Sequence, residues 1–138
     1  MKKVLLILVG VLALATAAVF VLHIRAGPLA KLVPKPAPAV QLYDAGSFLT
    51  NLDDPVTTRY IKVDIELKVR GTGATAQLKA EKAQVDDAIL AVLRSRTPQE
   101  VSGSAGMGSL QTAVAAAVDR VLTHGKVLKV YFTTFMVE

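Results

Sequence analysis

A run of residues without formal charge, from Val4 to Ile24, constrains the fold of this 138-residue chain more than any other feature. As a helix the run would be roughly 32 Å long at about 1.5 Å per residue, which matches the roughly 30 Å hydrocarbon core of a bilayer. We therefore expect residues 4–24 to form a transmembrane anchor. A cleaved signal peptide is the alternative, because Ala15-Thr16-Ala17 resembles a small-residue cleavage site. Apolar residues continue to Leu22, however, so cleavage there would leave half of the run on the mature chain.

Basic residues flank the run on both sides, at Lys2, Lys3, Arg25, Lys31 and Lys35. Because the two sides carry similar positive charge, charge counting alone leaves the orientation open. A short lysine tail ahead of an uncleaved apolar segment usually stays in the cytoplasm. We therefore expect residues 1–3 in the cytoplasm and the chain after the anchor on the periplasmic side of the inner membrane.

Residues 25–39 form a linker that holds four of the six prolines of the chain, namely Pro28, Pro34, Pro36 and Pro38. Prolines at alternate positions favour polyproline II, so the proline-containing part from Gly27 to Ala39 should be a semi-rigid spacer of up to about 40 Å at roughly 3.1 Å per residue. It is either a plain spacer or an arm that lies along another membrane protein. Composition favours the plain spacer.

The formal net charge of +5 comes entirely from the first 38 residues, because residues 39–138 carry 11 basic and 11 acidic side chains. A formally neutral domain whose aromatic residues lie mostly in apolar strand patterns lacks the footprint of a nucleic-acid-binding protein. We therefore expect no nucleic-acid partner. The chain has no cysteine, which excludes disulfides, thiolate metal sites and a cysteine nucleophile.

The domain expected over residues 40–138 begins with a β-hairpin. Apolar and polar residues alternate from Tyr60 to Val69, as in a strand with one buried face and one solvated face. Asp53-Asp54-Pro55 is a turn signal. The apolar residues of segment 48–52 ahead of it predict a short strand that pairs with residues 60–69.

Two helices are predicted after the hairpin. Apolar residues at helical spacing indicate an amphipathic helix from about Ala74 to Ser95. Residues 102–108 are rich in glycine and serine, which predicts a flexible connection. Ser109 is then expected to cap a second helix, which Gly125 should terminate as its left-handed residue.

The last predicted element is a strand over residues 126–137, which is apolar on both faces. Such a strand should be central in the sheet or buried by a partner. The order strand, strand, helix, helix, strand predicts a small α+β domain.

Few side chains of this domain are candidates for chemistry. His124 lies where a favourable contact with a helix C-terminus explains it better than general-base catalysis. Neighbouring carboxylates in Asp53-Asp54 and Asp86-Asp87 diverge on a strand or a helix, so neither pair forms a metal or acid-base site by itself. Gly71-Thr72-Gly73 lacks the remaining residues of a phosphate-binding loop. We therefore predict no catalytic, cofactor-binding or metal-binding residues, and a role in scaffolding or interaction.

Several short motifs stand in order along the chain: Asn51-Leu52, Arg59-Tyr60-Ile61-Lys62-Val63, Ile89-Leu90 with Val92-Leu93, Gly125-Lys126-Val127, and Val130-Tyr131-Phe132-Thr133-Thr134-Phe135. Together they resemble the FliL family of flagellar basal-body proteins, and the last motif is the most specific. The resemblance covers nearly the whole chain, including the short tail, the span and the linker. Many family members carry an acid where Thr134 stands, so no role for that acid is transferred to this chain.

The resemblance implies a single-pass inner-membrane protein with a periplasmic domain similar to the stomatin (SPFH-like) fold, in which two helices pack on a small sheet. It also implies a homo-oligomeric ring around the MotA/MotB stator, chiefly around the MotB periplasmic linker, that supports torque, swimming, swarming and rotational control in chemotaxis. The linker residues expected to contact the stator are Pro34, Lys35 and Pro36. The residues expected to mediate self-association are Val130, Tyr131, Phe132 and Phe135.

The alternative is a singly anchored periplasmic binding module for a small ligand or a cell-wall polymer. A binding module predicts a monomer with a concave polar site, whereas a scaffold predicts oligomers that form with increasing concentration. A membrane-tethered enzyme would need convergent titratable groups, and the sequence offers none.

Overall fold

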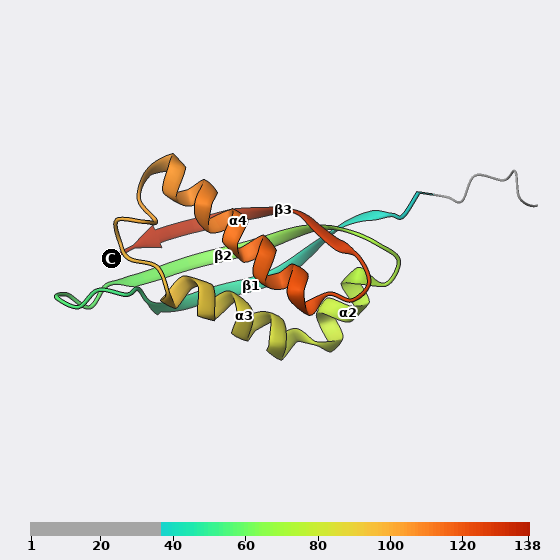
Figure 1. Cartoon of the computed structure of the whole chain (residues 1–138), viewed down its shortest axis with the longest axis horizontal. Coiled ribbons are helices and arrows are strands. Elements are labelled where there is room, and N and C mark those ends of the chain that lie inside the picture. Colours follow the sequence, from blue (N-terminus) through green and yellow to red (C-terminus); the bar gives the residue numbers. More distant parts are fainter. Residues whose placement is uncertain (1–36) are drawn as a thin grey trace, which may run out of the picture. The chain divides into compact units, whose positions relative to one another are not determined.

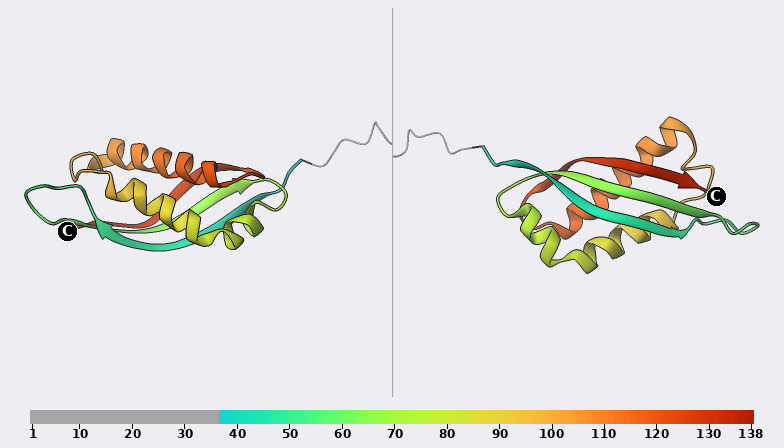
Figure 2. Two further views of the ribbon diagram at one scale, coloured as in Figure 1. Left: turned by 60° about the horizontal axis from the view of Figure 1, so that its bottom comes forward. Right: turned by 180° about the vertical axis from the view of Figure 1, so that it is seen from behind.

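The computed structural model describes residues 37–138, so the expected anchor at residues 4–24 and most of the linker lie outside the described residues. The elements, in chain order, are β1 (Val40–Asn51), β2 (Tyr60–Arg70), α2 (Ala74–Ala80), α3 (Lys82–Arg94), α4 (Gly103–Val121) and β3 (Lys126–Val137). The strands form one antiparallel sheet in the order β1-β2-β3, and the helices lie on one face of it (Figures 1 and 2). The predicted α+β class is confirmed, with three helices in place of two. Within residues 37–138, no helix is both long and apolar enough to cross a membrane.

The core lies between the sheet and the helices. β2 is the central strand, and its alternating apolar residues from Ile61 to Val69 are all at most 1% exposed, as the sequence pattern predicted. Side chains from the helices complete the core, chiefly Leu78, Val85, Ile89, Leu93, Leu110, Val114 and Val118. Residues Pro38–Glu138 therefore form a compact unit with a hydrophobic core of its own.

Both outer strands contain β-bulges, each of which adds one residue and reverses the alternation of the side chains that follow. In β1 the register shifts at Ala45. In β3 it shifts at Leu128 and again at Thr133. Phe132 and Phe135 are three residues apart, yet they pair with the inward-facing residues of β2 and both pack against the core. The bulges therefore explain why β3 reads as apolar on both faces.

The alternative that β3 is central is wrong, because β3 is an edge strand of this sheet. The other alternative, that a partner buries β3, stays a prediction. β1 also differs from the short strand expected, since it extends over 12 residues from Val40. Its first half was missed because Val40, Leu42 and Asp44 do not alternate cleanly with their neighbours and the bulge at Ala45 breaks the pattern.

The helix expected over residues 74–95 is two helices that meet at Glu81, whose φ of −103° and ψ of 27° interrupt the helical path. The interruption lets α2 pack against β1 and β2, while α3 packs against α4.

The connection expected over residues 102–108 is helical, because α4 begins at Gly103 with Ser102, and not Ser109, as its N-cap. Gly106 lies where the backbone of α4 comes close to the backbone at Glu100. A Cβ on Gly106 would lie 2.6 Å from the Glu100 carbonyl oxygen. α4 ends at Val121, so Gly125 does not terminate it. Gly125 instead has a φ of +119° in the turn that leads into β3.

Candidate interaction surfaces

The four residues predicted to mediate self-association divide between the two faces of the sheet. Val130 is 2% exposed and belongs to the core. The rings of Phe132 and Phe135 stack with centroids 5.8 Å apart and an interplanar angle of 21°, partly buried against the core. Tyr131 faces the opposite side, where Lys129 Nζ lies 5.1 Å from its ring centroid. The four side chains therefore do not form one surface patch, and their role in self-association stays a prediction.

The predicted stator-contact residues Pro34, Lys35 and Pro36 lie outside the described residues.

Figure 2 (right) shows the face of the sheet opposite the helices, called the open face here. By register, this face carries polar and apolar side chains in rows across the three strands. The register defines five rows: Val40–Arg70–Lys126, Leu42–Lys68–Lys129, Asp44–Glu66–Tyr131, Ser47–Asp64–Thr134 and Leu49–Lys62–Met136. The first two rows hold four cations, the next two hold three acids, and the last row is largely apolar. Charge is thus sorted along the open face from one end to the other.

The fourth row contains a hydrogen-bonded carboxylate. The Ser47 hydroxyl donates to Asp64 Oδ1 across β1 and β2. This bond, followed by one from Thr134 on β3, lowers the pKa of Asp64 below its ordinary value. The row is a structural link between strands, because Asp64 has no second carboxylate or histidine beside it in its row.

The apolar end of the open face contains a shallow cavity of about 190 Å³. Leu49, Tyr60 and Met136 line it together with Lys62 and Glu138. These three apolar residues are exposed by 67%, 46% and 48%, respectively. Exposed apolar side chains gathered in one place are typical of contact surfaces.

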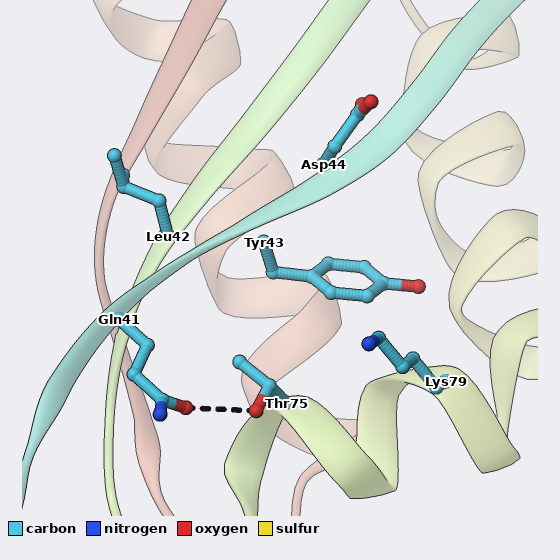
Figure 3. A pocket seen from close by; sticks show the side chains of 6 residues that line it. All are labelled: Gln41, Leu42, Tyr43, Asp44, Thr75 and Lys79. Atoms are coloured by element: carbon cyan, nitrogen blue, oxygen red, sulfur yellow. Dashed lines mark hydrogen bonds between the residues drawn. The ribbon is translucent and has the colours of Figure 1, made fainter.

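A larger cavity of about 560 Å³ lies between β1 and α2 (Figure 3). Tyr43 Oη donates to the Leu78 carbonyl oxygen at 3.4 Å, and Thr75 Oγ1 donates to Gln41 Oε1 at 2.8 Å. Asp44 points away from Lys79 in Figure 3, so the acidic and basic groups of this cavity do not converge. Its side chains can form hydrogen bonds with a ligand, but they lack a paired acid and base for catalysis.

The acid pairs considered from the sequence have ordinary structural partners. Asp54 Oδ1 accepts hydrogen bonds from the N–H groups of Val56 and Thr57 at 2.9 and 3.1 Å, and these bonds lower the pKa of Asp54. Asp86 pairs with Lys82 at 2.7 Å on the exposed side of α3. In the part of the chain from residue 37 to residue 138, no three potential metal ligands come together.

Sequence reasoning missed the row structure of the open face. Lys68 and Arg70 were visible as outward residues of the alternating strand, but their neighbours across the sheet depend on the bulges of β1 and β3. The signal available was the set of basic residues near the ends of two predicted strands.

The described domain is similar to known proteins. The family described as flagellar basal body-associated protein FliL matches residues 42–137. The match runs from the third residue of β1 to the end of β3. The chain belongs to the FliL family. It is also 30% identical over 91 residues to a flagellar protein FliL of Aquifex aeolicus. That alignment covers 66% of this chain and 56% of the relative, so the chain spans about half the length of the relative it matches.

The FliL match contains every strand and helix of the described domain apart from the first two residues of β1, and the motif Val130 to Phe135 lies within it. The resemblance drawn from the sequence is therefore confirmed. The family identifies a flagellar protein associated with the basal body.

Proposed function

We propose that this FliL-family chain is a non-enzymatic scaffold of the flagellar basal body, anchored in the inner membrane by residues 4–24 with its domain in the periplasm. The domain self-associates around the MotA/MotB stator and supports torque, swimming, swarming and control of rotation. The observation that carries this proposal is the family match over residues 42–137, which includes all the described elements apart from the first two residues of β1. A stomatin-like relationship of the α+β domain belongs to the same proposal.

The arrangement of polar groups supports a non-catalytic role. The hydrogen-bonded acids Asp54 and Asp64 have partners that stabilise a turn and a strand pairing. The larger cavity has no converging acid and base. We therefore infer that the domain acts by binding other proteins and holding them in place.

Self-association through the faces of the domain is favoured over addition of strands at the sheet edges. Both edge strands, β1 and β3, contain bulges, and bulges protect exposed edges from pairing with another chain. The apolar end of the open face, with Leu49, Tyr60 and Met136, offers a surface for a second copy.

Disulfide crosslinking in cells tests the stator contact, because the natural chain has no cysteine to compete. Cysteines at Pro34 and Lys35 should form adducts with cysteines in the MotB segment just outside the membrane. A cysteine at Ala83, on the exposed side of α3, serves as the control and should form none. Absence of any adduct across several linker and MotB positions would remove direct contact from the proposal.

The cavity between β1 and α2 keeps a binding module as a second candidate, since about 560 Å³ is enough for a small polar ligand. Sedimentation of the fragment 38–138 over a range of concentrations separates the two candidates. Reversible oligomers support the scaffold, whereas a monomer that binds a cell-wall fragment supports the binding module.

A further inference from the structure

The first two rows of the open face form a basic end that has no acidic partner in the domain. Arg70 pairs with Lys126 across β2 and β3, and Lys68 pairs with Lys129. Within residues 37–138, none of these four cations lies in a salt bridge. The nearest acids by register, Asp44 and Glu66, stand in the following row.

Like charges directly opposite each other on neighbouring strands destabilise a sheet. Two such pairs in adjacent rows concentrate the repulsion at one end of the domain. An anionic surface laid over the rows would relieve this repulsion. The arrangement therefore fits a negatively charged partner better than it fits the isolated domain.

Two exposed aliphatic side chains complete the basic end. Val40 and Leu42 occupy the same rows on β1 and are exposed by 47% and 64%, respectively. Amphipathic helices that lie at the boundary between lipid headgroups and acyl chains combine cations with apolar side chains in the same way. An acidic protein surface would also pair with the cations and cover the aliphatic pair. The choice between the two partners therefore depends on the position of the basic end in the chain.

The position of the basic end in the chain favours lipid. Val40 begins β1, and only residues 25–39 separate it from the apolar run that ends at Ile24. Such a tether raises the effective concentration of the domain at the membrane, so even weak contacts become populated. The open face itself is a broad sheet surface that none of the helices within residues 37–138 covers (Figure 2, right).

We propose that the basic end of the open face, formed by Arg70, Lys126, Lys68 and Lys129 with Val40 and Leu42, docks on the anionic phospholipid headgroups of the membrane that anchors the chain. The inference rests on the anchor of the proposed function but not on the stator or on self-association. Docking orients the apolar end of the open face away from the bilayer, where Leu49 and Met136 stay available to other proteins.

Spin-label quenching tests this docking with the full chain. A single cysteine at Leu42 carries the fluorophore NBD, and the protein is reconstituted into vesicles that contain phosphatidylcholine spin-labelled at the headgroup. One set of vesicles also contains phosphatidylglycerol, and the other does not. Leu49→Cys is the matched control, because Leu49 lies on the same face of β1 at the opposite end and is similarly exposed.

The probe at position 42 should be quenched in the vesicles with phosphatidylglycerol and should recover at high salt, whereas the probe at position 49 should stay unquenched. Each lysine near an anionic surface changes the binding equilibrium about five-fold, so K68Q combined with K129Q should lower the ratio of docked to free domain about 25-fold. K62Q, at the apolar end, should leave that ratio unchanged. Circular dichroism confirms that each variant is folded.

Equal quenching at position 42 with and without phosphatidylglycerol would overturn the proposal, as would quenching that the double variant leaves intact. Flotation of the same vesicles reports the anchor separately. Protein that floats with the vesicles but shows no quenching would refute lipid docking while leaving the proposed function standing. Protein that does not float would refute the anchor itself.

Discussion

Gly125 lies where the turn before β3 crosses the end of β2, and we predict that G125A destabilises the domain severely. The residue has a φ of +119°, which side chains with a Cβ rarely adopt. An added Cβ would lie 2.7 Å from the Arg70 carbonyl oxygen and 2.8 Å from Ala74 Cβ. The substitution therefore combines backbone strain with a steric clash against neighbours that cannot easily move.

The expected loss follows from these two contributions. A strained backbone conformation costs roughly 1–3 kcal/mol, and overpacking costs roughly 1–3 kcal/mol more. The free energy of unfolding should thus fall by about 2–6 kcal/mol, against a total of about 5–15 kcal/mol for a typical domain.

Two other glycines separate the contributions. Gly46 has a φ of +100° but no atom within 4 Å of an added Cβ, so G46A should cost only about 1–3 kcal/mol from strain. Gly108 lies inside α4 with open space around it and no positive φ, so G108A should raise the stability by up to about 1 kcal/mol.

Urea unfolding of the unit 38–138, followed by circular dichroism, measures all three variants. The reasoning requires the order G108A, wild type, G46A, G125A from most to least stable. A loss for G125A no larger than that for G46A would refute the steric part, and a destabilised G108A would refute the assignment of open space around Gly108.

Three further predictions concern charge, pH and the core. Lys129→Glu turns its like-charged pairing with Lys68 into an opposite pair, so the free energy of unfolding in urea should rise by about 0.5–1 kcal/mol at low salt and by less at high salt. An unchanged free energy of unfolding would contradict the repulsion. Ser47→Ala removes the hydrogen bond that lowers the pKa of Asp64, so an NMR titration should find that pKa closer to 3.8. Because the folded pKa lies below the unfolded value, Asp64 stabilises the fold above pH 3.8 and loses this contribution as the pH falls through the folded pKa, so S47A should show a weaker acid dependence. Ile89→Ala should cost about 2–5 kcal/mol in the same urea assay, and a loss below about 1 kcal/mol would place Ile89 outside the core.

The parts of the fold that depend on local pattern could be predicted from the sequence. The alternation from Tyr60 to Val69 identified β2, because one face of that strand is buried and the other is solvated. The position of β3 in the chain was likewise predicted, but not its place at the sheet edge. Edge and centre differ by the neighbours of a strand, which its own residues do not specify.

Bulges and glycines account for most of what was missed. The bulges at Leu128 and Thr133 shift the register between β2 and β3, and this shift depends on the pairing of two distant segments. A glycine in a sequence fits a flexible loop as well as a close approach, so Gly106 was assigned to a loop although it packs beside Glu100 in the first turns of α4.

The candidate surfaces were harder to predict than the fold. Three of the four predicted self-association residues pack in or against the core, because the bulges turn them inward. The basic end requires the combined register of three strands, which no single strand reveals.

Motor function in the parent organism tests the central claim most directly. The gene is deleted, and rotation of tethered cells, swarming and reversal frequency are measured with and without the full-length chain supplied in trans. The account predicts that torque or swarming falls on deletion, that the full chain restores it, and that a chain lacking residues 40–138 does not. Unchanged torque, swarming and reversal in the deletion strain would contradict a role at the stator.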